Sequence, residues 1–310
     1  CDIKEDRAIA ASKKYNCAYY TDYKKMVDEA DINSVHICTP HYLHAPMAIY
    51  AAGAKKHVLT EKPMTIEYHD AKEMVQTAKN NNVTLGVIFQ NHYNAGSQLI
   101  KSTLDEGKLG KILSAKAVIT WDRSDKYYSK SDWKGTWDKE GGGVIIDQAI
   151  HTLDLMRWFI NSKIDFVDAN ISNRVHNIIH VEDSAEGIIK FKSGTIACFF
   201  AVNYYAYDAP VEIELYCENG TAKMIGDKAI IQFKEGGVIE GEKDASEVLN
   251  YGNGVKSYWG VSHSKQIKRF YKSISKGEKP EIDGEYGLKT QEMIVAIYNS
   301  GKTGRKINFV

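Results

Sequence analysis

Residues 141–154 (GGGVIIDQAIHTLD) carry the side chains best suited to proton-transfer chemistry. Three glycines lead into an apolar run typical of a helix, and Asp147 and His151 stand four residues apart in it. On an α-helix this spacing places two side chains on one face, about one turn apart. A carboxylate beside an imidazole, on a rigid element after a flexible loop, can orient a hydroxyl and exchange its proton. The competing interpretation is a solvated polar pair that follows an ordinary loop.

The same segment also offers a possible set of metal ligands. Asp147, His151 and Asp154 would supply two carboxylates and one imidazole. No further cluster of His or Cys supports this reading, and the five cysteines are scattered without CxxC spacing, so we expect no metal. Cys38 and Cys198 lie in apolar, strand-like runs, which predicts small buried side chains and a reduced, cytoplasmic protein.

Length and charge limit the class of protein. A chain of 310 residues predicts two domains, each able to bury a core. The 40 basic and 40 acidic residues cancel, which argues against a nucleic-acid or membrane-surface binder. No apolar run approaches the roughly 20 residues of a membrane span.

Elements that could position these residues alternate between helix and strand in the first third of the chain. Strands separated by helices of about ten residues predict βαβ units in a parallel sheet, with ligands bound beyond the carboxyl ends of the strands. The TPHYLH and TEKP sequences lie at such strand ends. The predicted strands are 35–38, 57–60 and 84–89, and the predicted helices are 4–15, 45–54 and 68–80.

After about residue 110 the pattern becomes strand-rich, and turn signals join neighbouring strands. This pattern predicts a mostly antiparallel sheet. Two helices are expected to close the chain, with Gly277 and Gly301 as their C-terminal stops. Residues 235–254 are rich in glycine and charge, which predicts a mobile loop. The predicted strands are 112–121, 166–174, 185–191, 195–202, 211–216, 221–225 and 229–233, and the closing helices are 264–275 and 286–300.

The first recognisable element is a helix, although the first strand of a dinucleotide-binding fold is central. If two strands are absent, we expect a gap between the strand at residue 35 and those at 57 and 84, with unpaired backbone on each side. We therefore expect the native protein to carry about 30 further N-terminal residues, the span of a βαβ opening.

Three separated motifs together resemble the Gfo/Idh/MocA oxidoreductases, the family of glucose-fructose oxidoreductase and inositol dehydrogenase. They are TPHYLH at 39–44, EKP at 61–63 and the glycine-led segment at 141–154. The resemblance covers nearly the whole chain. It implies a parallel, Rossmann-type dinucleotide-binding domain over residues 1–95. It also implies an α+β domain with a large open, mostly antiparallel sheet over residues 96–310, with the closing helices near the domain interface.

The resemblance implies NAD as cofactor and does not exclude NADP. Asp2 would match the family's acidic residue that binds the adenosine ribose and repels a 2′-phosphate, although Lys4 lies nearby. The family's Gly-rich phosphate loop has no counterpart from Cys1 onward. The Lys62–Pro63 peptide is often cis in this family. The residues expected to contact the cofactor are Asp2, Thr39, Pro40, His41, His44, Glu61, Lys62 and Gln90.

The resemblance also assigns catalytic roles. Lys62 would stabilise an alkoxide as the proton leaves, and His151 would act as general base and acid, with an ordinary pKa near ~6.5. Asp147 would orient the substrate hydroxyl or the imidazole. Asp154, one turn further on, is expected to be structural.

Substrate contacts are expected from two regions. Residues 121–137 interleave aromatic rings, which can stack on sugar C–H faces, with polar groups that can bond hydroxyls. An ordinary amphipathic connector is an equally simple interpretation of that segment. His92 stands where many family members carry Arg, which argues against assuming an anionic group there. The residues expected to bind substrate are Asn91, His92, Arg123, Tyr127, Trp133 and Trp137.

The implied activity is hydride transfer between NAD(P) and a secondary hydroxyl of a sugar, cyclitol or derivative. Two alternatives stay open. One is redox-neutral glycoside cleavage through a 3-keto intermediate, and the other is a non-catalytic protein that senses sugar or cofactor. An open sheet commonly buries one face against another subunit, so a homodimer or homotetramer through that face is expected.

Overall fold

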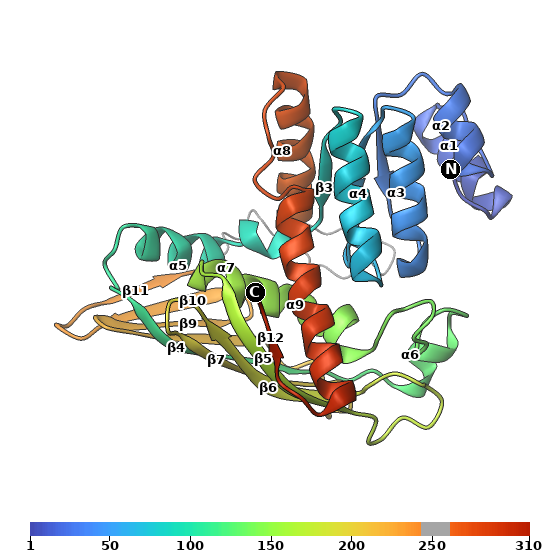
Figure 1. Ribbon diagram of the computed structural model, residues 1–310. Helices are drawn as coiled ribbons and strands as arrows, with labels where there is room; N and C mark the ends of the chain where they lie inside the picture. Colours follow the sequence, from blue (N-terminus) through green and yellow to red (C-terminus); the bar gives the residue numbers. More distant parts are fainter. Residues whose placement is uncertain (243–260) are drawn as a thin grey trace.

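A computed structural model describes residues 1–242 and 261–310 and places them around two sheets (Figure 1). The smaller sheet contains three parallel strands, β1 (Ser34–Ile37), β2 (His57–Thr60) and β3 (Leu85–Val87), in chain order. Helices α3 (His44–Gly53) and α4 (Tyr68–Asn80) connect them, as the alternating pattern predicts. The carboxyl ends of β1 and β2 therefore deliver the TPHYLH and EKP sequences to one edge of the sheet.

The expectation of a gap between the strand at residue 35 and the next strand is wrong. β1 pairs directly with β2 in parallel, with Ser34 opposite His57 and Ile37 opposite Thr60. Consecutive strands of βαβ units are usually neighbours, because a short crossover helix returns the chain beside the strand it left. Two helices precede this sheet, α1 (Glu5–Tyr15) and the unpredicted α2 (Tyr23–Glu29).

The larger sheet has nine strands in the order β11-β10-β9-β8-β4-β7-β6-β5-β12. All neighbours are antiparallel except β4 and β7, which run parallel. All seven predicted strands are present. The strands are β4 (Ile112–Thr120), β5 (Ile164–Ser172), β6 (Ser184–Phe191), β7 (Ile196–Val202), β8 (Glu212–Cys217), β9 (Gly220–Ile225), β10 (Lys228–Phe233), β11 (Val238–Gly241) and β12 (Ile307–Asn308).

β11 corrects one expectation, because it lies in the tract that was predicted to be a mobile loop. β11 pairs with β10, with Val238 opposite Gln232 and Gly241 opposite Ala229. Glycines before the strand and at its end gave the tract a loop-like composition, while the pairing with β10 orders it. Residues 243–254 of the same tract lie outside the described part of the chain.

One face of the larger sheet is covered by helices α5 (Ala95–Asp105), α7 (Ile150–Ile160) and α9 (Gly284–Thr303) (Figure 1). The other face of its central strands presents apolar side chains to solvent: Ile188 is 44% exposed, Ile196 46% and Phe200 41%. Cys198 lies on this exposed face, opposite Ile188, and Cys38 is also exposed. The expectation that both thiols are buried is wrong. An apolar run on an open sheet buries only alternate residues, which leaves Cys198 exposed, whereas Cys38 lies just after the end of β1.

The closing helices join the two sheets. α8 (Ser262–Lys276) packs on the smaller sheet, where Phe270 contacts Leu59 and Ile88. Gln266 donates to the main-chain oxygen of Val87 at the end of β3 and accepts the N–H of Phe89. α9 packs against α4 and against β5 of the larger sheet.

Only one of the two predicted helix stops is correct. α8 ends at Gly277, whose φ of 66° is left-handed. Gly301 lies inside α9, which ends at Gly304 with φ of 63°. A Cβ at Gly301 would lie 2.7 Å from Ile171 on β5, so this glycine permits close packing. Among the described helices, none has the length and apolar character to cross a membrane.

Candidate functional site

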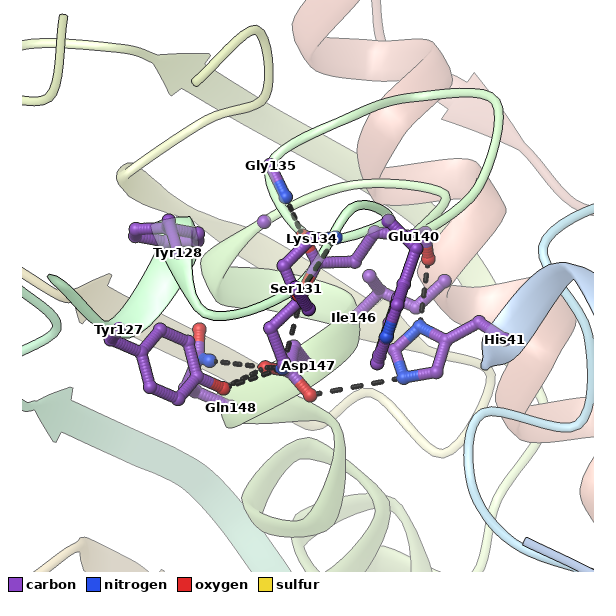
Figure 2. Close-up of polar contacts among 12 residues, drawn as sticks. His41, Tyr127, Tyr128, Ser131, Lys134, Gly135, Glu140, Ile146, Asp147 and Gln148 are labelled. Atoms are coloured by element: carbon purple, nitrogen blue, oxygen red, sulfur yellow. Dashed lines mark hydrogen bonds and ion pairs between the residues drawn. The ribbon is translucent and has the colours of Figure 1, made fainter. Parts of the chain in front are cut away.

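Asp147 is the centre of a cluster of polar side chains drawn from three parts of the chain (Figure 2). Lys62, from the EKP turn after β2, places its ammonium 3.1 Å from Oδ1 and 2.6 Å from the main-chain oxygen of Asp147. Tyr127 and Lys134 belong to the aromatic segment, residues 121–137, and each donates to Oδ2 at 2.7 Å. Gln148 donates to the same oxygen at 2.6 Å. The carboxylate is therefore surrounded by donors.

The helix that carries Asp147 begins with an irregular turn. Residues Val144–Ala149 form a π-helix before α7, a feature found mostly as single turns and often at functional sites. His151 lies beyond this turn, in α7, and the expected side-by-side arrangement of Asp147 and His151 does not form. No hydrogen bond or ion pair joins these two side chains in the described structure, and Asp147 does not orient the imidazole directly.

The three glycines before the helix permit a tight approach of several elements. Gly142 has a φ of 152°, and a Cβ there would lie 2.0 Å from the hydroxyl oxygen of Tyr298 on α9. A Cβ at Gly143 would lie 2.0 Å from the main-chain oxygen of Glu182. The buried Glu182 carboxylate accepts the N–H groups of Gly143 and Ile145 at 2.8 and 3.0 Å. These contacts hold the start of the helix and thereby the position of Asp147.

The electrostatics of the cluster keep Asp147 ionised. Burial alone would raise its pKa, but the nearby ammonium groups of Lys62 and Lys134 outweigh burial and hold the pKa well below its usual value. Its neighbour Glu140 shows the opposite shift. Burial and the negative charge of Asp147 raise the pKa of Glu140 to about 8, against the opposing effect of Lys134. Glu140 is therefore mainly protonated at neutral pH.

The sequence prediction missed Lys134, Glu140 and Gln148. Lys134 lies 2.7 Å from Asp147 and 3.6 Å from Glu140, and it also donates to the Tyr127 hydroxyl at 2.6 Å. Signals for all three exist in the sequence. Lys134 follows Trp133 in the aromatic segment, Glu140 directly precedes the three glycines, and Gln148 follows Asp147. The contacts themselves could not be inferred from spacing, because the segment folds back onto the helix.

The two strand-end loops are locked together by a buried histidine. The Lys62–Pro63 peptide is cis, as the family resemblance implies. His44 is fully buried, with Nδ1 2.7 Å from the Pro63 oxygen and Nε2 2.8 Å from the Thr39 oxygen. Burial lowers the pKa of His44, so the neutral ring donates to one of these carbonyls. Both ring nitrogens face the protein, and the expected cofactor contact of His44 is corrected to a structural role.

His41 lies in the Asp147 cluster and not along an open loop. Its Nδ1 is 2.8 Å from the Glu140 main-chain oxygen and its Nε2 is 3.8 Å from Asp147 Oδ1, as Figure 2 shows. Its ring packs against Trp133, with centroids 4.7 Å apart. Burial lowers the pKa of His41 to about 3, so the ring is neutral. The position differs from the expected contact with cofactor phosphates or adenine, because the loop after β1 turns toward the glycine-led helix.

His151 and Gln90 both present polar atoms that lack partners. His151 Nδ1 and Gln90 Oε1 are buried, and neither has a hydrogen-bond partner in the described structure. Burial, with the charge of Lys62, lowers the pKa of His151 to about 3, so the imidazole is neutral. Buried polar atoms are normally paired. Both atoms are therefore open to a group that the polypeptide itself does not supply.

Glu61 lies at the other side of the EKP turn. Its Oε1 is 3.1 Å from His263 Nε2 on α8 and 3.8 Å from His36 Nε2 on β1. Burial would raise the pKa of Glu61, but these two histidines and Lys62 lower it overall. Glu61 is thus an ionised carboxylate at the carboxyl edge of the smaller sheet.

His92 belongs to a buried network between α7 and α9, and its expected contact with substrate remains a prediction. The side chain is fully buried, with Nε2 2.6 Å from Asp154 Oδ2 and 3.2 Å from the Tyr286 hydroxyl. Its ring lies against Trp158, with centroids 4.1 Å apart. Asp154 also contacts Arg157 at 3.2 Å. His92 and Asp154 therefore hold α7 to α9, which agrees with the structural role expected for Asp154.

The aromatic segment divides into two groups. Tyr127 and Trp133 adjoin the Asp147 cluster. Trp137 does not, because its indole donates to the His180 oxygen at 2.8 Å and its ring packs on Tyr298. Its expected substrate contact remains a prediction. Arg123 pairs with Asp208 at 2.7 Å and stacks on Tyr127, which places it one layer behind the site.

Four further expected residues make contacts that do not indicate a bound ligand. Thr39 donates to the Met47 sulfur at 3.6 Å, and Pro40 directly precedes the short helix at His41–Leu43. Asn91 is partly exposed after β3. Asp2 accepts the N–H of Lys4 at 2.8 Å. Their proposed contacts with cofactor or substrate remain predictions.

Comparison with known proteins identifies the family. Residues 1–89 match the family model described as oxidoreductase family, NAD-binding Rossmann fold. Residues 97–223 match the model of the GFO/IDH/MocA C-terminal domain. The two models describe the N-terminal and C-terminal domains of one family. They match this chain in the same order, and together they cover most of it. The chain therefore belongs to the Gfo/Idh/MocA family of oxidoreductases.

Three relatives carry the names of, or were solved with, sugars or a cyclitol. Myo-inositol 2-dehydrogenase of Thermotoga maritima is 24% identical over 290 residues, which cover 92% of this chain and 83% of the relative. The WlbA dehydrogenase from Bordetella pertussis, solved with NADH and UDP-GlcNAcA, is 24% identical with a TM-score of 0.84, covering 100% of this chain and 89% of that chain. A levoglucosan dehydrogenase, solved with NADH and levoglucosan, is 22% identical with a TM-score of 0.87, covering 99% and 88%. These two structures share the fold described above.

Proposed function

We propose that this protein is an NAD-dependent dehydrogenase that oxidises a secondary hydroxyl of a sugar, cyclitol or derivative. One observation carries the proposal. The Lys62 ammonium is paired with a buried, ionised Asp147 at a wall that also includes Tyr127 and Trp133. A fixed cation of this kind stabilises the negative charge that develops on a hydroxyl oxygen as its proton leaves.

The residues present fit a nicotinamide cofactor. Gln90 Oε1 can accept a hydrogen bond from an amide group, and this atom is buried without a protein partner in the described structure. Glu61 offers an ionised carboxylate to ribose hydroxyls at the edge where ligands of parallel sheets bind. Bound NAD supplies the acceptor for the hydride that leaves the substrate carbon. Asp2 is proposed to bind the adenosine ribose and to favour NAD over NADP.

The side chains of the protein are proposed to transfer the proton, to stabilise the oxygen that loses it and to hold both groups in position. His151 is proposed to accept the hydroxyl proton because its buried Nδ1 has no partner among the described residues. Burial lowers its pKa to about 3, which keeps the ring neutral and also makes it a weak base. Lys62 holds the oxygen from which that proton leaves. Asp147 fixes the direction of the Lys62 ammonium, and Lys134 and Tyr127 fix Asp147 in turn. Asp147 is therefore proposed to act on geometry and charge, with no direct contact to His151.

The substrate class follows from the surroundings of Asp147. Trp133 and Tyr127 can stack on the C–H faces of a sugar ring, while the Lys134 ammonium can donate to hydroxyls. Myo-inositol 2-dehydrogenase and levoglucosan dehydrogenase are relatives whose names identify polyhydroxylated rings as substrates. A cyclic polyol or sugar is therefore the proposed substrate.

A panel of sugars and cyclitols, followed by NADH absorbance, tests this function. The proposal expects steady NADH formation with at least one member of the panel. Product analysis runs on the same mixtures. Cleaved glycoside without net NADH would replace the proposal with redox-neutral cleavage, and NAD binding without any product would replace it with a sensing role.

A homo-oligomer is proposed through the uncovered face of the larger sheet. Ile188, Ile196 and Phe200 are exposed together on neighbouring strands β6 and β7. Clustered apolar side chains on a sheet face favour burial against a second copy.

A further inference from the structure

Side chains with metal-binding atoms gather beyond the ends of β1 and β2, outside the Asp147 cluster: His36, Cys38 and Glu61 form one group, and His263 contacts Glu61. Glu61 Oε1 lies 3.8 Å from His36 Nε2 and 3.1 Å from His263 Nε2. The ligand atoms of His36, Cys38 and Glu61 all lie within 4.8 Å of one another. These four residues come from β1, the chain just after it, the EKP turn and α8, and they are called the strand-end cluster here.

The spacing suits a small tetrahedral cation. Zn²⁺ binds imidazole nitrogen, carboxylate oxygen and thiolate sulfur at roughly 2.0–2.3 Å, which places the ligand atoms of a tetrahedron roughly 3.3–3.8 Å apart. The two measured distances around Glu61, 3.1 and 3.8 Å, bracket that range. The Cys38 sulfur lies within 4.8 Å of the His36 and Glu61 ligand atoms.

The ligand atoms are also available. His36 Nε2 is buried and has no hydrogen-bond partner among the described residues, which is unusual for a buried polar atom. Cys38 is a free, exposed thiol. A thiolate and the Glu61 carboxylate together would balance the charge of a divalent cation, and two neutral imidazoles would complete four ligands.

A second group of possible ligands lacks these features. His69, Asp70 and Glu73 lie within one turn of α4, and His69 and Glu73 are exposed. Such groups are common on helix surfaces without a metal. The mixture of sulfur, nitrogen and oxygen ligands and the unpaired buried nitrogen therefore distinguish the strand-end cluster.

We propose that His36, Cys38, Glu61 and His263 form a binding site for a thiophilic divalent cation such as Zn²⁺. The occupied site inhibits the enzyme, because a metal-bound Glu61 cannot contact the nicotinamide ribose. This second part rests on the proposed function. The sequence could not indicate the site, since its ligands come from segments more than 200 residues apart.

Titration of the purified full chain with Co²⁺, a spectroscopic substitute for Zn²⁺, tests the binding site. A Cys38 thiolate ligand predicts a thiolate-to-cobalt charge-transfer band in the near ultraviolet with one ion per chain. Cys38→Ser should abolish this band, and His36→Gln should weaken Co²⁺ binding at least tenfold. Cys198→Ser, which removes an exposed thiol on the larger sheet, is the matched control and should leave the titration unchanged. No band in the unmodified protein, or a band that persists in Cys38→Ser, would overturn the site.

Competition with NAD tests the consequence separately. The apparent Kd for NAD should rise in proportion to Zn²⁺ concentration above the Zn²⁺ Kd, and this rise should disappear in Cys38→Ser. An unchanged NAD Kd in the Zn²⁺-saturated protein would overturn the inhibition. If the panel shows no sugar oxidation, the proposed function fails, yet the Co²⁺ band would still decide the metal site.

Discussion

Lys62 contacts Asp147 twice, through the main-chain oxygen at 2.6 Å and through Oδ1 at 3.1 Å. This relationship joins the EKP turn of the smaller sheet to the glycine-led helix above the larger one. The double contact restricts the ammonium to one direction, and preorganised charge is more effective in catalysis than charge on a freely rotating side chain. The π-helical turn at Val144–Ala149 determines where both oxygens of Asp147 lie.

Lys134 is predicted to support catalysis by positioning Asp147 and Tyr127. Lys134→Met removes the donor to both side chains, so Asp147 can rotate away from Lys62. We expect turnover to fall about ten- to a hundredfold, the order seen when one positioned polar group is lost, with NAD affinity nearly unchanged. Steady-state kinetics with the best substrate of the panel, together with NAD binding, measures both.

Lys130→Met is the control for this prediction, because Lys130 is an exposed lysine on the same segment. It should leave kcat and KM unchanged. Lys134→Arg should restore part of the turnover, since the guanidinium keeps the charge. Normal turnover in Lys134→Met would contradict the role given to Lys134.

Glu140 is predicted to make the protein less stable as pH rises. The unfolded carboxyl has an ordinary pKa of 4.5, whereas burial and the charge of Asp147 raise the folded pKa to about 8. Between these values the folded state binds more protons than the unfolded state, so the free energy of unfolding falls as pH increases through that window. Glu140→Gln removes this titration.

Thermal unfolding at pH 6 and pH 9 measures the Glu140 effect. The Tm of the unmodified protein should fall more between the two pH values than the Tm of Glu140→Gln. Glu278→Gln, at an exposed acidic residue after α8, is the control and should behave like the unmodified protein. Equal pH dependence in Glu140→Gln and the unmodified protein would rule out a buried protonated Glu140.

Tyr298 is predicted to hold the start of the glycine-led helix. Its hydroxyl donates to Glu182 Oε1 at 2.8 Å and accepts the Ile146 N–H at 3.1 Å. Tyr298→Phe leaves both partners without this bond in a buried place, and should lower the free energy of unfolding by about 1–3 kcal/mol. Urea unfolding measures the loss. Tyr271→Phe, at a tyrosine that is 40% exposed on α8, should have little effect, and an equal loss in both variants would refute the assignment.

The uncovered sheet face is predicted to be a subunit interface. Ile188→Lys or Phe200→Lys places a charge in the middle of that face and should shift the oligomer toward monomer in light scattering after size-exclusion chromatography. Val175→Lys changes another exposed apolar residue, outside the strands, and serves as control. A monomeric unmodified protein would contradict the interface.

The sequence predicts the elements of this fold well. Hydrophobic periodicity and turn residues give the strands and crossover helices of the first third within a few residues, because each signal is local. Where burial is decided by distant elements the prediction fails. His92 follows a predicted strand, where residues of a binding site are expected, yet α7 and α9 enclose it. Gly301 is a glycine after a helical pattern, which predicts a helix end. It lies inside α9 instead, where close packing against Ile171 on β5 requires a small residue.

The candidate site is predicted only in part for the same reason. Motifs identify Lys62 and Asp147, and the structure brings these two together. Lys134 and Glu140 join them through a loop that returns from the aromatic segment, a path that residue spacing does not encode. The π-helical turn also breaks the regular helix on which the side-by-side pairing of Asp147 and His151 was based.

The most direct test of this account is the rate of NADH formation by Lys62→Met with the best substrate of the panel. The account predicts a loss of at least about a hundredfold in kcat, as expected when a charge that stabilises the developing oxyanion is removed, while the protein still binds NAD. Lys56→Met, in the same part of the smaller domain, should retain normal turnover. Turnover by Lys62→Met equal to that of the unmodified protein would contradict the account.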